Sequence, residues 1–194
     1  MDENPRLTKP GTAIESPSVP THLGPLAQTL VDELARNDVS HVVGIPDNTS
    51  AALYRLLAET SSITPLTVTR EGEAFAVASG LWLGGSKPLV LIQNTGLLES
   101  GDSLRGTALR MGVPLVCLIT YRGYTTLPSE GSDGVMTRAD IDSVAVVTEP
   151  TLEAWRIPYE LFRSDADIPR VQRAFAQAHE LSRPVALLLT QALC

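Results

Sequence analysis

The sequence predicts a doubly wound α/β domain with a mostly parallel sheet and helices on both of its faces. Two observations support this fold class. Short apolar segments of strand length alternate with segments of helical periodicity along the chain. Most of the strand segments are apolar at every position, as in strands that helices cover on both faces. No apolar run approaches the roughly twenty residues that span a bilayer, so the domain is expected to be soluble.

The helical and strand segments can be followed in order from residue 23. Leu26, Leu30, Val31 and Leu34 recur at helical spacing, which predicts a first helix ending near residue 37. The expected strands are 41–43, 65–68, 88–92, 115–119, 159–162 and 185–189. The expected helices are one capped by Asn48 or Thr49, one containing 74–81, and those at 104–111, 138–144, 151–155 and 168–181.

Two segments fall outside this alternation. Residues 1–22 are rich in proline and charge, which predicts a flexible lead-in to a single domain at 23–194. Residues 121–136 contain Gly123, Pro128, Gly131 and Gly134 among small polar residues. A loop of this length usually has a functional reason, so we expect an active-site lid.

Composition excludes several classes of function. Fifteen basic and twenty-two acidic side chains give a net charge of -7, which argues against nucleic acid or an anionic membrane as a partner. Cys117 lies within an apolar strand and Cys194 at the terminus, a spacing that indicates neither disulfides nor a metal cluster. A reducing cytoplasm is therefore expected, and no metal site is expected from the cysteines or the three histidines.

Polar residues follow several of the predicted strands. These segments are 44–48, 70–72, 93–96 and 121–123. Because parallel strands end at one edge of a sheet, and open α/β sheets bind ligands there, these segments are expected to converge on one site.

Glu71 is the candidate catalytic residue. It stands where a strand gives way to a helix, and an acid there is also explained by a helix-dipole contribution of about 0.3 to 1 kcal/mol. The small residues that follow, among them Gly72, Ala74 and Ala78, favour chemistry because they allow a flat ligand to approach closely. A carboxyl group beside such a ligand can share a proton with a ring nitrogen.

The other candidates each have a structural alternative. The Gly44-Ile45-Pro46 turn suits either a ligand contact or simple chain reversal, and Asn48 suits a helix cap. Residues 93–96 can orient a substrate or form a tight turn. Arg122 can bind an anionic substrate or be an exposed cation. Neither a G-x-S-x-G, a G-x-G-x-x-G nor a P-loop sequence occurs, which argues against hydrolase, Rossmann and P-loop enzymes.

Taken in order, five motifs resemble the pyrimidine-binding domain of thiamine diphosphate-dependent decarboxylases, in particular sulfopyruvate and phosphonopyruvate decarboxylases. The motifs are Gly44–Asp47, Arg70–Ala74, Gln93–Leu97, Tyr121–Gly123 and Ile157–Glu160, and the resemblance runs from about residue 25 to about residue 192. It implies the fold of that domain, thiamine diphosphate as cofactor, and a small anionic 2-oxo acid as substrate, with an aldehyde and carbon dioxide as products.

The resemblance also implies roles for particular residues. Glu71 is expected to hydrogen-bond the aminopyrimidine ring nitrogen of the cofactor. The expected cofactor contacts are Ile45, Pro46, Gln93, Asn94, Thr95 and Gly96, and the expected substrate contacts are Asp47, Asn48 and Arg122. The magnesium signature of such enzymes does not occur here. The resemblance thus implies a separate beta-type chain that holds Mg²⁺ and the diphosphate, in a hetero-oligomer.

Two departures from the family pattern leave alternatives open. Relatives read Gly-Leu-Gly-Asn where this chain has Gly96-Leu97-Leu98-Glu99, and the lid lacks an expected histidine. The identity of the 2-oxo acid and the choice between protonation and carboligation are therefore open. The alternative function is a non-catalytic assembly or regulatory subunit that retains the fold.

Overall fold

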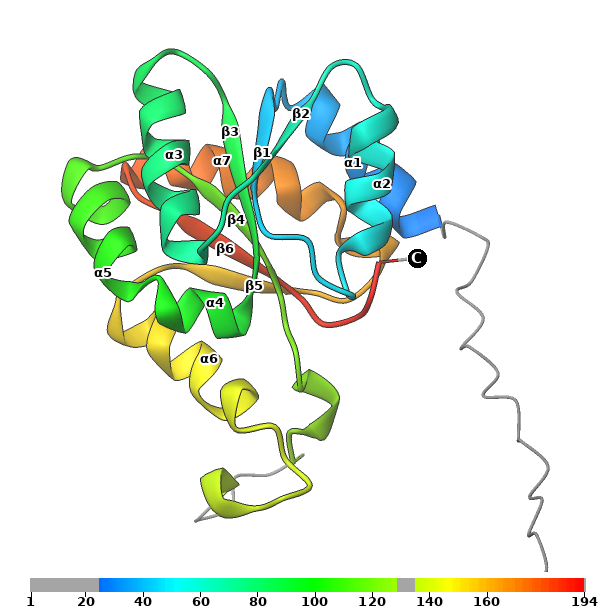
Figure 1. The fold of residues 1–194 in the computed structure, drawn as a ribbon, viewed down its shortest axis with the longest axis vertical. Coiled ribbons are helices and arrows are strands. Elements are labelled where there is room, and N and C mark those ends of the chain that lie inside the picture. The colour runs from blue at the N-terminus through cyan, green and yellow to red at the C-terminus, as the bar shows by residue number, and fades with distance from the viewer. Residues whose placement is uncertain (1–24, 129–134, 194) are drawn as a thin grey trace, which may run out of the picture.

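The computed structural model describes residues 25–128 and 135–193, and its centre is a six-stranded sheet. The expected flexible segment at 1–22 and part of the expected lid lie outside the described residues. The sheet order is β2-β1-β3-β4-β6-β5, and every neighbouring pair is parallel (Figure 1). The strands are β1 (His41–Gly44), β2 (Thr64–Thr67), β3 (Pro88–Gln93), β4 (Val116–Thr120), β5 (Tyr159–Phe162) and β6 (Val185–Leu189). Each strand end lies within one residue of its predicted position.

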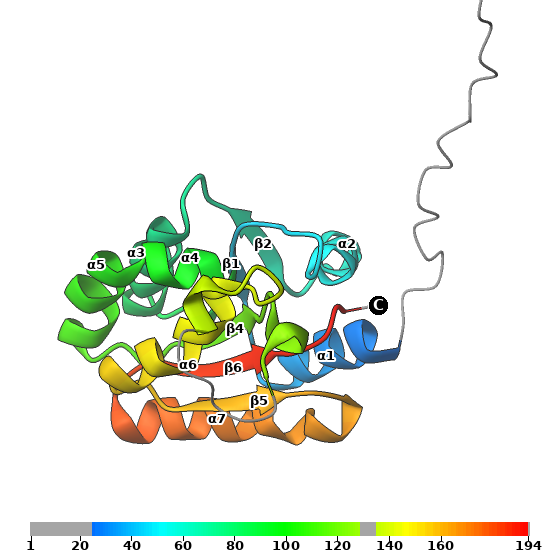
Figure 2. The ribbon, with the colours of Figure 1, turned by 90° about the horizontal axis from the view of Figure 1, so that it is seen from below.

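Helices cover both faces of this sheet, as predicted. The α-helices are α1 (Pro25–Arg36), α2 (Ala51–Glu59), α3 (Glu71–Leu83), α4 (Asn94–Glu99), α5 (Gly101–Leu104), α6 (Ser143–Ala154) and α7 (Pro169–Leu181). Short turns of other helix types are η1 (Arg105–Leu109), η2 (Tyr124–Thr126), η3 (Val135–Thr137) and η4 (Asp165–Asp167). Figure 1 shows α1 and α2 on one side of the strands and α3 and α5 on the other, and Figure 2 shows α7 running along the sheet. No helix among the described residues is long and apolar enough to cross a membrane.

Strand β4 shows why the strands are apolar throughout. Val116 and Leu118 pack in the core beneath α1, α2 and α7, whereas Cys117 and Ile119 pack in the core beneath α3, α5 and α6. All four side chains are buried. Because successive strand side chains point to opposite faces, a sheet covered on both faces needs apolar residues at every position.

Three predicted helix boundaries were wrong. Residues 94–96, expected as a turn, begin α4 directly after β3. The helix expected at 104–111 begins earlier, as α5, and continues as the π-helical turn η1. The separate helices expected at 138–144 and 151–155 are one helix, α6, which continues through Pro150. Proline gives up one helical hydrogen bond, but Ala145 and Leu152 on either side of it are buried and hold the helix against the sheet.

Candidate active site

The carboxyl ends of β1 and β3 form the topological switch point of the sheet. These strands are neighbours, and the chain leaves β1 towards α2 on one face but leaves β3 towards α4 on the other. Open α/β sheets bind ligands in the crevice at such a point. The loop 45–50 and the start of α4 therefore border the expected ligand crevice.

Glu71 lies at this edge of the sheet, as the first residue of α3. Its side chain packs directly against Gly96 in α4. A Cβ atom at position 96 would lie 2.2 Å from Cγ and 2.6 Å from Oε1 of Glu71, so only glycine leaves room for this carboxylate. The Glu71 side chain is partly buried and receives no hydrogen bond or ion pair from any described residue.

Glu99 holds the two residues that flank Glu71. It forms an ion pair with Arg70, and its Oε2 accepts a hydrogen bond of 3.1 Å from the backbone nitrogen of Gly72. The Ser103 hydroxyl donates to the Gly72 carbonyl at 2.6 Å. These contacts fasten the first turn of α3 to α4 and α5, beside a hollow of about 360 Å³. Glu99, which departs from the family pattern, therefore holds the residues around Glu71 in place.

Glu73 is exposed to solvent and caps the start of α3. Its carboxylate accepts hydrogen bonds from the backbone nitrogens of Thr69 at 3.0 Å and Arg70 at 3.3 Å. The hydrogen bond from the Thr69 backbone is the main cause that lowers the pKa of Glu73 below its ordinary value. Of the two acids in this turn, Glu73 is therefore used as a helix cap, while the carboxylate of Glu71 remains available.

Asp47 joins three of the strand ends. Its Oδ1 accepts from the backbone nitrogen of Ser50 at 2.6 Å, and its Oδ2 accepts from Gln93 at 3.2 Å and from the Thr120 hydroxyl at 2.6 Å. Both carboxylate oxygens are thus engaged within the chain. Asp47 thus has a structural role in the chain, and its expected contact with substrate stays a prediction. The expected caps Asn48 and Thr49 are replaced by this Asp47 contact at the start of α2.

Asn94 also has a role inside the fold. Its side chain is fully buried, and its amide nitrogen donates to the carbonyl of Arg122 at 3.0 Å and to the Thr148 hydroxyl at 2.9 Å. Asn94 therefore ties β3 to α6 beneath the surface, and its expected contact with the cofactor stays a prediction. Its Oδ1 is buried without a hydrogen-bond donor among the described residues.

The remaining candidates lie along the crevice edge. Ile45 is partly buried and Pro46 and Asn48 are exposed, all in the loop after β1. Gln93 is partly buried, and its Oε1 accepts from the Thr95 hydroxyl at 3.0 Å. Since Asp47 holds the other end of the Gln93 amide, this side chain has a fixed orientation at the switch point.

Arg122 lies farther along the same edge, after β4. Its Nε donates to Asp142 at 2.8 Å, while its terminal nitrogens donate to no described acceptor. It borders a hollow of about 470 Å³ between the ends of β4 and β6, which Thr49 and Gln191 also line. The structure thus makes Arg122 a paired but exposed cation beside a cavity.

The sequence reasoning missed Thr120 and Ser103, and it noted Glu99 only as a departure from the family pattern. Thr120 ends a strand as the other candidates do, so its position was a usable signal. The contacts of Glu99 and Ser103 gave no local signal, because these residues meet Arg70 and Gly72 only when α4 and α5 fold beside α3. Among the described residues, no group of three or more His, Cys, Asp or Glu side chains could hold a metal ion.

Comparison with known proteins defines the family. Residues 25–144 match the family described as "Thiamine pyrophosphate enzyme, N-terminal TPP binding domain". The chain belongs to this family. The six-stranded parallel sheet is therefore that of a thiamine diphosphate (TPP) binding domain.

Individual relatives of this TPP-binding domain are decarboxylases. The chain is 24% identical over 161 residues to sulfopyruvate decarboxylase subunit alpha of Methanocaldococcus jannaschii, covering 82% of this chain and 89% of that one. It is 36% identical over 97 residues to phosphonopyruvate decarboxylase of Streptomyces viridochromogenes, covering 50% of this chain and 24% of that protein. The benzoylformate decarboxylase of Polynucleobacter necessarius shares the fold, with a TM-score of 0.61 at 20% identity over 84% of this chain and 29% of that chain.

Proposed function

We propose that this chain is the alpha-type subunit of a split thiamine diphosphate-dependent decarboxylase. Its substrate is a small anionic 2-oxo acid of the sulfopyruvate or phosphonopyruvate class, and its products are an aldehyde and carbon dioxide. The observation that carries the proposal is the Glu71 carboxylate, held against Gly96 at the switch point with no partner among the described residues. The names of the relatives support the reaction. The match along 89% of a relative named as an alpha subunit supports the split arrangement.

The residues at the crevice fit the pyrimidine half of the cofactor. When bound, thiamine diphosphate supplies the nucleophilic carbon and the electron sink for decarboxylation. With the cofactor bound, Glu71 would hold a proton at a ring nitrogen of the pyrimidine, and Gly96 provides the space that its carboxyl group needs. Ile45, Pro46 and Gln93 would border the ring.

Mg²⁺ and the diphosphate are held mainly by a beta-type partner chain in this proposal. Its support is the word "alpha" in the names of relatives that the chain matches along most of their length. A cytoplasmic location is part of the same proposal and is supported by Cys117, which is a free, buried thiol.

We propose that the partner covers the outer side of α3. Ala76, Gly80 and Leu83 recur at the spacing of one helix face, and all are exposed together with Val77. Val77 is 38% and Leu83 61% exposed, where a solvent-facing helix normally carries polar residues. The small side chains allow close approach, and the face continues from the turn that Glu71 begins.

Assembly tests this surface. Leu83→Glu is expected to abolish co-purification of the beta-type chain, because it places a charge in an apolar interface. Leu181→Glu is the matched control, since Leu181 is also exposed, at 44%, but ends α7. Equal assembly of both variants would refute the proposed surface.

The catalytic role is tested by Glu71→Gln in the assembled enzyme, with Glu73→Gln as the neighbouring control. Carbon dioxide release from sulfopyruvate and phosphonopyruvate is expected to fall about 10² to 10⁴-fold in the first variant and to change little in the second. Full activity of Glu71→Gln would contradict the assignment. A wild-type assembly that binds cofactor but releases no carbon dioxide from either acid would favour the non-catalytic alternative.

A further inference from the structure

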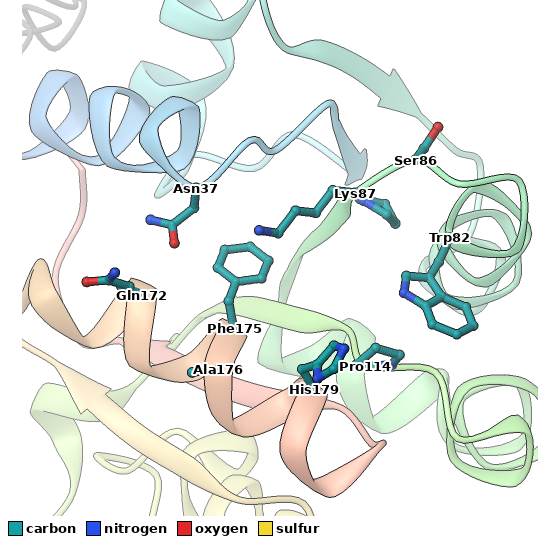
Figure 3. A pocket seen from close by; sticks show the side chains of 10 residues that line it. Asn37, Trp82, Ser86, Lys87, Pro114, Gln172, Phe175, Ala176 and His179 are labelled. Carbon is teal, nitrogen blue, oxygen red and sulfur yellow. The ribbon is translucent and has the colours of Figure 1, made fainter.

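A third hollow lies at the amino end of the sheet, at the edge opposite Glu71. It has a volume of about 430 Å³, within the range of roughly 300 to 1,000 Å³ that is usual for small-molecule sites. It lies between the end of α3 and the middle of α7. The side chains that decide its chemistry are Trp82, Lys87, Pro114, Gln172, Phe175 and His179 (Figure 3).

The charge of this hollow is opposite to that of the chain. Lys87 is the one lysine or arginine among its described lining residues, and no described acid lines it. The Lys87 ammonium lies 4.8 Å from the centre of the Phe175 ring and forms no ion pair with a described carboxylate. In a chain of net charge -7, a cation that is partly buried without an acidic partner is suited to an anion from outside the chain.

Apolar surface predominates in the walls of the hollow, and Asn37, Ser86, Gln172 and His179 add polar groups. Figure 3 shows Lys87 extending over Phe175, with Trp82 at one end of the hollow and Gln172 at the other. Trp82 is 36% exposed, so a large aromatic face remains available to a ligand. Pro114 adds a further rigid apolar surface. Aromatic walls with a few polar groups are typical of sites that bind small organic molecules.

We propose that this hollow binds a small planar organic anion, such as an aromatic carboxylate, with the carboxylate at Lys87 and the ring against Trp82. The site is separate from the crevice at Glu71 and does not depend on the proposed decarboxylase function.

Titration of the full-length chain with benzoate tests the proposal. Benzyl alcohol is the control that keeps the ring but carries no charge. Acetate is the control that keeps the carboxylate but has no ring. Calorimetry is expected to give a Kd on the order of 1 to 10 mM for benzoate, because so small a ligand makes few contacts. Lys87→Met, which keeps the chain length over Phe175, is expected to weaken binding about tenfold or more, and Lys87→Arg to retain it. Thermal unfolding checks that both variants fold.

Tryptophan fluorescence locates the ligand. Benzoate is expected to change the emission of a Trp155→Phe variant, which keeps Trp82, and to leave that of Trp82→Phe unchanged. Equal affinity of Lys87→Met and the wild type, or equal binding of benzyl alcohol and benzoate, would overturn the proposal. The absence of saturable benzoate binding would also overturn the proposal. This includes the case in which sedimentation shows that the chain self-associates, so that a second copy covers Trp82.

Discussion

Gly96→Ala is the substitution that most sharply tests how the fold positions Glu71. The added Cβ atom would lie 2.2 Å from Cγ and 2.5 Å from Cδ of Glu71, well inside van der Waals contact. The atoms that must move belong to one flexible side chain, so the carboxylate is expected to leave the crevice while the backbone stays in place.

The expected effect on stability is small. Overpacking costs about 1 to 3 kcal/mol, with the lower end expected because a side chain at the crevice edge can move aside. Gly96 lies within α4, and alanine in a helix gains up to about 1 kcal/mol over glycine. The free energy of unfolding is therefore expected to change by roughly 1 kcal/mol or less. Gly106→Ala is the control, because a Cβ atom at position 106 meets nothing within 4 Å.

The expected effect on catalysis is large. In the assembled enzyme, turnover of Gly96→Ala is expected to fall about 10² to 10⁴-fold, as for the loss of a general acid-base group, while Gly106→Ala stays active. Because Gly96 acts through Glu71, the double variant Gly96→Ala/Glu71→Gln is expected to be no slower than Glu71→Gln alone. Denaturant unfolding and carbon dioxide release measure the two quantities. A fully active Gly96→Ala enzyme, or multiplied losses in the double variant, would refute the reasoning.

Three further predictions follow from single contacts. Glu99→Gln removes the ion pair with Arg70 and is expected to lower the free energy of unfolding by less than about 1 kcal/mol. In 1 M salt the wild-type pair is screened, so the variant and the wild type are expected to differ little in stability. A larger loss of stability in high salt would contradict this prediction. Asp47→Asn replaces an acceptor oxygen with an amide donor opposite Ser50 or Thr120 and is expected to cost about 1 to 3 kcal/mol in a thermal melt, whereas unchanged stability would mean that the contacts at Asp47 are dispensable. Burial raises the pKa of the Cys117 thiol from 9.0 to about 12, so the unfolded state ionises first and stability falls by about 1.4 kcal/mol per pH unit between these values. Cys117→Ala should have a shallower slope of stability from pH 9 to 10, and equal slopes would exclude this effect.

Local patterns in the sequence determined the strands, the parallel sheet and the position of Glu71. All-apolar strands need cover on both faces, and parallel strands place their carboxyl ends at one edge, so Glu71 and Gln93 were expected together from sequence alone. A carboxylate after a strand and before a helix is a feature of neighbouring residues, which is why Glu71 could be singled out as a candidate without a structure.

Only the tertiary structure decided which polar groups are free to act. Asp47 was expected at the substrate, but Gln93 and Thr120 come to it from other strands and occupy its carboxylate. Glu99 was an unexplained departure until α4 packed beside α3 and placed it against Arg70 and Gly72. A hydrogen bond between residues far apart in the chain depends on how the helices and strands pack, and local sequence periodicity does not determine that packing.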